Sequence, residues 1–251
     1  MLGKKKEIKI KLDNQYNENK INNYNNDDEI LCDLMKLNED DIKLSKKLSL
    51  LEISTLYLDE FEIESYEGDD IKVIFSNPEL KEQYIIEKDQ TSFKLHTIEN
   101  LKKKKDSYGT IKVLVGSYLE IDKINLILTN QVNNLSKFKI IASALEIQTV
   151  KGLLKSNQIN VSSFSLNNIS CELFIESLTS ITVNINNISG KLSINSLNTD
   201  TLDIVNLFGE INICGNVESY LMDINSGTVN MNGKNISSTN GLRFRNNKKY
   251  N

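Results

Sequence analysis

The side chains able to do acid–base chemistry are few in this sequence, and their spacing is not typical of an active site. His96 is the single histidine, and it lies in the alternating run from Ser92 to Thr97, which predicts a surface strand. No Gly-x-Ser-x-Gly elbow accompanies it, so a histidine-activated serine is not indicated. The sequence also contains no GxGxxG or Walker-type phosphate loop.

Glu172 and Glu210 are the carboxylates whose expected separation comes nearest to that of a glycosidase. They hold equivalent positions two repeat units apart, about 9–10 Å if each coil is one strand spacing high, and inverting glycosidases keep roughly 6.5–9.5 Å. Lys191 stands between them. A neighbouring cation favours the ionised carboxylate, whereas a general acid must hold its proton. We therefore interpret the three residues as a charge ladder and predict no catalytic residue.

Metal and redox chemistry are not indicated either. Asp69 and Asp70 follow a glycine in a turn, but two acids fall short of the ligand count of a calcium site. The three cysteines are far apart and have no CxxC spacing, so we expect no disulfide framework, no zinc site and a reducing compartment. These cysteines are Cys32, Cys171 and Cys214. We predict no cofactor.

Composition limits the class of protein. The 251 residues have 39% hydrophobic residues, which is enough to form a core, and we expect a soluble chain. The net charge of −4 gives no broad basic surface, so we expect no nucleic-acid partner. The lysine run from Lys102 to Lys105 is interpreted as a solvated loop. No apolar segment of a signal peptide or membrane span is evident, so the expected location is cytoplasmic, with an envelope-associated location as the alternative.

The chain divides into four zones. Residues 1–47 contain an alternating stretch from Glu7 to Leu12, an Asn-rich tract from Asn14 to Asn26 that we interpret as flexible, and a short amphipathic helix. That helix is predicted over residues 28–47, from Ile30, Leu34 and Leu37, either as a cap on the domain or as a partner-binding helix. Residues 48–125 are an irregular β-region that caps or begins the next zone, 126–235, and residues 236–251 are a basic polar tail.

Residues 126–235 repeat one unit of 19 residues about six times. Six columns keep one residue class, five of them through four or more units, which is strong evidence for a repeat architecture. The columns are Leu126, Leu145, Phe164, Val183, Leu202 and Leu221; Leu128, Ile147, Leu166, Ile185 and Ile204, broken by Asp223; Val150, Ile169, Ile188 and Leu207; Leu135, Leu154, Leu173, Leu192 and Ile211; Ile175, Ile194 and Ile213; and Ile140, Ile159, Leu178 and Leu197.

Two further columns indicate how the unit turns. One reads Gly152, Cys171, Gly190, Gly209 and, after a one-residue deletion, Gly227; it predicts a turn with positive φ, in which Cys171 is the exception. The other reads Asn130, Thr149, Asn168, Asn187, Asn206 and Asn225, and stacked amides of this kind can bond from coil to coil. A row of asparagines that binds sugar or ice is the alternative interpretation of this second column.

These patterns predict an all-β fold, a single-stranded right-handed β-solenoid of about six 19-residue coils built from short strands. A single unit cannot bury its own apolar face, but stacked units can, with roughly 1.5–3 kcal/mol for each buried Leu or Ile. Both ends of such a stack would expose strand edges, so we expect the irregular β-region to cover one end and the basic tail to cover the other.

Several segments resemble the bacterial "putative adhesin" family, a β-strand repeat domain of unknown function. They are Ile185 to Ile194, Asp203 to Ile213, Phe61 to Ile63, Gly68 to Val73 and Thr110 to Val113, and the resemblance covers roughly residues 50–235. It implies a β-repeat fold, no established enzymatic activity and no catalytic residues. The family is often linked with membrane anchors or envelope-stress systems.

The function predicted from the sequence is a non-enzymatic interaction or regulatory scaffold of adhesin-like type. We expect a protein partner, and a monomer or weak oligomer. A cell-surface or envelope-associated adhesin or stress-response protein is the first alternative, and a carbohydrate-active β-helix enzyme is the second.

Overall fold

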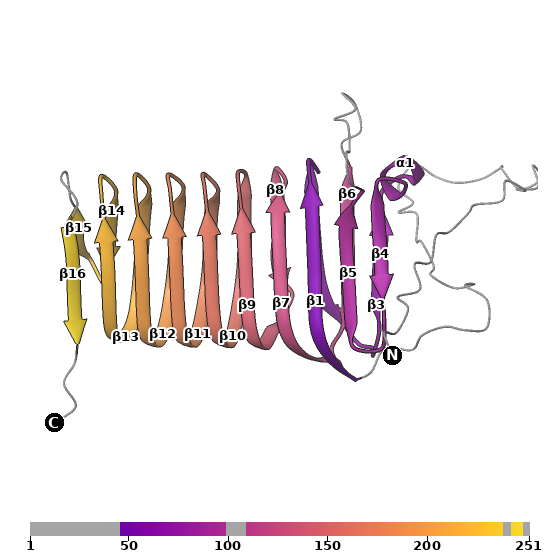
Figure 1. The fold of residues 1–251 in the computed structure, drawn as a ribbon, viewed down its shortest axis with the longest axis horizontal. Helices are drawn as coiled ribbons and strands as arrows, with labels where there is room; N and C mark the ends of the chain where they lie inside the picture. The colour runs from indigo at the N-terminus through magenta and orange to yellow at the C-terminus, as the bar shows by residue number, and fades with distance from the viewer. Residues whose placement is uncertain (1–45, 99–108, 238–241, 248–251) are drawn as a thin grey trace, which may run out of the picture.

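The protein is a β-solenoid whose coils stack along one long axis, as the sequence predicts (Figure 1). The structure, a computed structural model, describes residues 46–98, 109–237 and 242–247, so the predicted Asn-rich tract and almost all of the predicted helix lie outside the described residues. The elements are β1 Lys47–Leu56, β2 Glu60–Tyr66, β3 Ile71–Phe75, α1 Pro78–Lys81, β4 Tyr84–Lys88, β5 Ser92–Thr97, β6 Thr110–Gly116, β7 Glu120–Thr129, β8 Val132–Lys137, β9 Ile140–Thr149, β10 Leu153–Asn168, β11 Glu172–Asn187, β12 Lys191–Asn206, β13 Glu210–Ile224, β14 Thr228–Met231, β15 Lys234–Ser237 and β16 Leu242–Asn247.

Each regular coil is one long bent strand, where the sequence predicted two short ones. Residues 153–156 of β10 pair with β8 on one face, and residues 159–168 pair with β9 on the other, all in parallel. In Figure 1 a coil rises on the near face, turns back at the upper edge and returns on the far face one step along, which is the expected right-handed path. Hydroxyl groups support the bend: Ser180 bonds the Thr182 carbonyl at 2.8 Å, and Thr199 bonds the Thr201 carbonyl at 3.0 Å.

The 19-residue register holds through the middle of the stack. Leu154, Leu173, Leu192 and Ile211 face one another in four successive coils and are all at most 1% exposed. The inward positions of both faces join one continuous hydrophobic core. Stacking therefore buries the apolar columns that a single unit would leave in water.

At its N-terminal end the predicted register is wrong. Leu126 pairs with Ile147, a step of 21 residues instead of 19, and Leu135 pairs with Ser156, again a step of 21. The two extra residues lie between Leu135 and Ile140, where Phe138 turns into the core and is only 4% exposed. Burial of this one aromatic side chain accounts for the longer coil.

The predicted register is also wrong at its C-terminal end. Leu202 pairs with Tyr220, a step of 18, because one residue is missing next to Gly215 and not just before Gly227. Met222 therefore fills the apolar column at 0% exposure, and Asp223 lies opposite Val205.

A side-chain contact from the final hairpin closes the irregular coil at Gly215. The Asn232 side chain accepts a hydrogen bond from the Gly215 N–H at 2.8 Å and donates one to the Gly215 carbonyl at 2.9 Å. A Cβ at Gly215 would lie 2.0 Å from the Leu197 carbonyl oxygen, so the site requires glycine. The hairpin of β14 and β15 is thereby fastened to the last regular coil.

The N-terminal strands are interlaced with later ones. β1 lies between β5 and β7, β2 lies between β6 and β8, and β6 lies between β2 and β3. The strands that end the sheets in the described residues are antiparallel: β3 on β6, β4 on β5, β15 on β14 and β16 on β13. Each end of the stack is therefore covered by returning strands, β3 and β4 at one end and β15 and β16, from the C-terminal segment, at the other.

Candidate functional site

A ladder of buried asparagines runs through the regular coils. The Asn168 amide donates to the Asn187 side-chain oxygen at 2.8 Å, and the Asn187 amide donates to that of Asn206 at 3.0 Å. Thr149 begins the ladder by donating its hydroxyl to Asn168 at 2.8 Å. These side chains are at most 2% exposed, so this column cannot meet sugar or ice.

The two outer members of the predicted column are not part of the ladder. Thr149 pairs with Leu128, so Asn130 lies two residues past the ladder position. The Asn130 amide donates to Thr55 and Asn133 instead. At the other end Ile224, not Asn225, lies opposite Asn206. The register shifts at both ends of the repeat are the reason.

Each ladder asparagine also closes its own turn. Asn168 accepts a hydrogen bond from the Cys171 N–H at 3.0 Å, and Asn206 accepts one from the Gly209 N–H at 3.2 Å. The Asn187 amide donates to the Gly190 carbonyl at 3.0 Å. Because the asparagine and the residue three positions later are both held inside, the two residues between them must point outward.

Those outward residues form a surface feature that we call the turn ridge, along the upper edge of the coils in Figure 1. Its aliphatic row is 41%, 45% and 42% exposed at Val150, Ile169 and Ile188, and continues with the half-buried Leu207. Phe208, beside Leu207, is 61% exposed. The turn ridge therefore presents one large apolar side chain per coil, in register.

The serines beside the aliphatic row are exposed, but their hydroxyls bond back to the coil before them. Ser170 donates its hydroxyl to the Val150 carbonyl at 2.8 Å, and Ser189 donates to the Ile169 carbonyl at 2.9 Å. The hydroxyls of Ser170 and Ser189 are therefore already bonded, and the remaining outward side chains of the ridge are the apolar ones and, in its first coil, the exposed Lys151.

Sequence reasoning grouped the ridge column with the apolar repeat columns and did not distinguish it from the core. Its position between the asparagine and the glycine of the turn was the signal that could have marked it as exposed. Contiguous exposed apolar side chains mark an interaction surface more often than single ones do.

The predicted reason for the turn glycines is wrong at three positions. Positive φ occurs at Gly152, with φ +99°, but not at Gly190, Gly209 or Gly227. At those three a Cβ would lie 2.0–2.4 Å from the amide nitrogen of the ladder asparagine in the preceding coil. Space, not backbone conformation, requires glycine there.

The same contact explains why Cys171 is tolerated. In the coil before Cys171 the ladder position is Thr149, which is shorter than asparagine and has no amide nitrogen to meet a Cβ at position 171. Cys171 has no positive φ, so the strain that the sequence suggested is absent.

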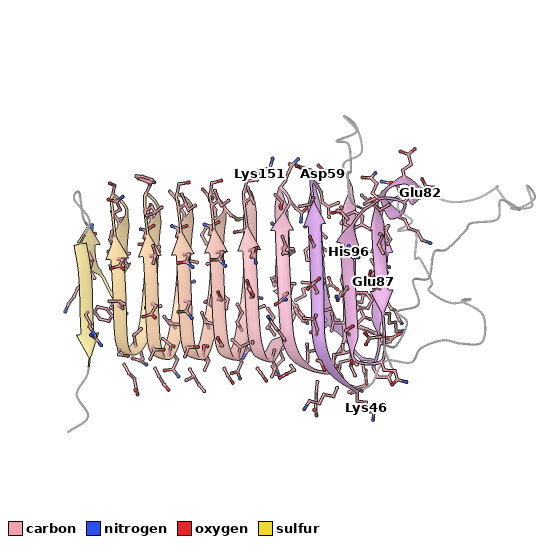
Figure 2. The ribbon with its side chains drawn as sticks, in the orientation of Figure 1. Lys46, Asp59, Glu82, Glu87, His96 and Lys151 are labelled. Carbon is pink, nitrogen blue, oxygen red and sulfur yellow. The ribbon has the colours of Figure 1, made fainter. Side chains whose placement is uncertain are left out.

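Of the candidate acid–base residues, His96 lies in β5 on the outward face beside Glu87 of β4 (Figure 2). Its Nε2 is 3.6 Å from a Glu87 carboxylate oxygen, and its side chain is 35% exposed. Among the residues that the structure describes, His96 belongs to no group of His, Cys, Asp or Glu side chains that could hold a metal ion.

Glu172, Lys191 and Glu210 lie in one row of exposed side chains across β11, β12 and β13. The Lys191 Nζ is 3.7 Å from Glu210, and both side chains are about half exposed, at 63% and 48%. The three predicted residues are therefore in register, and one ion pair of the predicted charge ladder, Lys191 with Glu210, is present. The Lys102 to Lys105 run lies outside the described residues, and Asp69 and Asp70 lie in the turn between β2 and β3.

A cluster of ion pairs that the sequence did not reveal lies where β2, β6 and β8 meet. The Glu64 carboxylate is 2.9 Å from the Lys137 Nζ and 3.1 Å from the Lys112 Nζ, and Lys112 also lies 3.7 Å from Glu62. Burial by itself raises the pKa of Glu64, but the hydrogen bonds from Lys137 and Lys112 outweigh it and leave the pKa below 4.5. An ionised, doubly bonded carboxylate of this kind ties three strands together and is unsuited to proton transfer.

Within the described ranges, no group of three or more His, Cys, Asp or Glu side chains could hold a metal ion, and no helix is long and apolar enough to cross a membrane.

Alkaline pH is expected to weaken the fold through two buried groups. Burial raises the pKa of the Cys171 thiol from 9.0 to about 11, and burial raises the pKa of Tyr84 from 10.0 to about 12. The folded protein holds these protons longer than the unfolded chain, so their stabilisation is complete below pH 9 and is lost as the pH rises towards 11 and 12.

The Cys171→Ala variant tests this expectation. Between pH 9 and 11 the free energy of unfolding should fall further in the wild type than in the variant, and the two decreases should differ by about 2 kcal/mol. Urea unfolding at several pH values measures the difference, and Cys214→Ala, which removes an exposed thiol, is the control. Equal pH slopes for Cys171→Ala and wild type would show that the thiol does not titrate in this way.

No family model and no curated protein matches the sequence. Similar solved structures include a "putative adhesin" from Bacteroides fragilis, with a TM-score of 0.47 and 11% identity over 75% of this chain and 93% of that one. A "putative lipid binding protein" from Parabacteroides distasonis has a TM-score of 0.37 and 17% identity over 76% and 94%. A "putative cell adhesion protein" from Clostridium sporogenes has a TM-score of 0.30 and 11% identity over 67% and 66%.

No family model places the chain in the family that the sequence resembles. At identities this low the names say nothing about the ligand of this chain.

Proposed function

We propose that this chain is a non-enzymatic binding scaffold that recognises another protein through the turn ridge. The observation that carries the proposal is the row of Val150, Ile169 and Ile188, each 41–45% exposed at the same position of successive coils, with Phe208 at 61% near its end. A soluble repeat protein gains nothing in folding from apolar side chains held in water, whereas a partner that covers them gains their burial.

A protein partner fits this surface better than a highly charged ligand does. On the near face the outward positions beside the ridge are uncharged in β10 and β11, with Asn167 opposite Asn186. On the other side the ridge is bordered by the alternating charges of Glu172, Lys191 and Glu210. Apolar anchors surrounded by neutral polar side chains are the usual composition of a protein–protein contact. Repeat proteins use extended regular surfaces of this kind for binding.

The ridge is tested by quantitative cross-linking capture in the native cells, with the soluble and membrane fractions kept separate. The Ile169→Ser/Ile188→Ser variant should lose at least about 10-fold of the capture of the wild-type partner, since two anchors of roughly 1 kcal/mol each are removed. Both positions are exposed, so thermal unfolding should be nearly unchanged.

The matched control is Ile181→Ser. Ile181 is 55% exposed, and it lies seven residues before Ile188 along β11, so about 23 Å separate it from the ridge. Equal loss of capture in the control and in the ridge variant, or no specific partner of the wild type, would refute the ridge as the binding surface. Glycan cleavage that is abolished by Glu172→Gln/Glu210→Gln would instead favour the carbohydrate-active alternative.

A further inference from the structure

The outer edge of β4 is the least covered sheet end of the solenoid's N-terminal half. β4 pairs with β5 on one side and is the last strand of its sheet in the described residues. On β4, Ile85 is 40% exposed and Ile86 is only partly buried against the core. On the neighbouring end strand β3, by contrast, Ile71, Val73 and Phe75 are at most 2% exposed.

A strand edge of this kind presents unpaired backbone donors and acceptors that a further strand can bond. It also leaves the apolar end of the core partly open at Ile86. A further strand paired with the outer edge of β4 would bond these backbone groups, and it would also cover the core at Ile86 if its inward side chains were apolar.

The outward charges say which side chains such a strand should carry. Across the sheet Glu87 of β4 faces Lys94 of β5, and Lys94 faces Glu52 of β1, so the sign of the charge alternates from strand to strand. Figure 2 shows Glu87 at this end of the row, next to His96. Opposite charges on neighbouring strands stabilise a sheet, so the position outside Glu87 favours a cation.

The chain itself has a segment with this pattern, Glu7-Ile8-Lys9-Ile10-Lys11-Leu12, which lies outside the described residues. Ile8, Ile10 and Leu12 alternate with charged residues, and two of those are lysines. The segment from residue 13 to residue 46 links it to β1, and a flexible chain of that length spans roughly 30 Å. Since β4 is two strands away from β1, about 10 Å, the segment can reach it.

We propose that residues 7–12 add to the outer edge of β4 as one more strand of the chain's own sheet. Ile8, Ile10 and Leu12 cover the end of the core at Ile86, and Lys9 or Lys11 lies beside Glu87. Tethering gives the segment an effective concentration in the millimolar range, so the docked form does not need high intrinsic affinity.

Disulfide trapping in the full-length chain tests the proposal. Glu87→Cys is combined with Lys9→Cys or with Lys11→Cys in a Cys32→Ser/Cys214→Ser background, in which the remaining Cys171 is buried. Opposed Cβ atoms of neighbouring strands are about 4.5–5.5 Å apart, so one of the two pairs should oxidise at least 10-fold faster than the control pair of Glu87→Cys with Asn19→Cys. The product should run as a monomer.

A control pair that cross-links as fast as either lysine position would overturn the proposal. A covalent dimer would also overturn it, because it would show that the segment docks on a second copy. Hydrogen exchange of the chain with its native charges gives an independent readout: the amides of β4 should be protected at least about 10-fold more in the wild type than in Ile8→Asp/Ile10→Asp. Equal protection in the two proteins, with unchanged exchange in β10 to β12, would likewise refute the docked strand.

Discussion

Replacing Asn187 by aspartate should lower the free energy of unfolding by about 3–5 kcal/mol, which is a large share of the stability of an ordinary domain. The Asn187 amide nitrogen donates to the Gly190 carbonyl and to the Asn206 side-chain oxygen, each at 3.0 Å, and the residue is 1% exposed. An aspartate oxygen in place of this nitrogen would face two acceptors with no proton to share, in a buried site.

The adjacent residue supplies the control. Asn186 is exposed, and its amide donates to Asn167 at 2.9 Å, so Asn186→Asp should cost less than 1 kcal/mol. Urea unfolding of both variants at pH 7 measures the contrast. The deficit of Asn187→Asp should narrow as the pH falls, because the protonated carboxyl regains one donor. Similar small losses in both variants would mean that the ladder contributes little to stability.

The Gly190→Ala variant should lose about 3 kcal/mol or more, because overpacking at a rigid contact forces neighbouring atoms apart. Its Cβ would lie 2.2 Å from the Asn168 amide nitrogen and 2.2 Å from the Cys171 carbonyl oxygen. Gly233→Ala measures backbone strain alone, since Gly233 has φ +78° but open space around a Cβ. That change should cost about 1–2 kcal/mol.

A second substitution tests the cause of the Gly190 effect. In the Asn168→Thr background, which copies the pairing of Thr149 with Cys171, the Cβ at position 190 meets a shorter side chain. The double variant should therefore lose less unfolding free energy than the sum of the losses of the two single variants, by about 1–3 kcal/mol. Urea unfolding measures this difference. Strict additivity would show that the asparagine is not what excludes a side chain at position 190.

The proposed binding surface and the buried ladder are built from the same turns. The asparagine that closes a turn also pushes Ile169 or Ile188 outward, so the order of the proposed binding surface depends on the buried ladder beneath it. Ladder variants should therefore lose partner capture as well as stability, whereas ridge variants should lose capture alone. This difference separates the structural role of the turns from their proposed function.

The sequence alone was enough to predict the solenoid, its regular middle and the asparagine ladder. The same inward position is apolar in four successive coils, at Leu154, Leu173, Leu192 and Ile211, because each coil packs against the core in the same way. A local pattern repeated in this way can be recognised from the sequence alone. The charge ladder of Glu172, Lys191 and Glu210 followed from the same register.

The ends of the repeat and the direction of the turn side chains were decided only by the tertiary structure. Phe138 enters the core and lengthens one coil, and the loss of a residue at Gly215 shortens another. Ile169 and Ile188 look like core residues by type, yet the hydrogen bonds of Asn168 and Asn187 turn them towards solvent. Neither effect has a period that the sequence could display.

The interlacing of the N-terminal strands was decided in the same way. Lys47 pairs with Glu120, and Glu60 pairs with both Thr110 and Val132, so strands distant in sequence became neighbours. The repeat pattern is local and recurs in every unit of the sequence. Each of these strand pairings occurs only once, and it depends on which strand edges and core positions are still unoccupied in the folded chain. For that reason the sequence determined what one coil of this protein is, and the tertiary structure decided where the stack begins and ends and which of its apolar side chains face solvent.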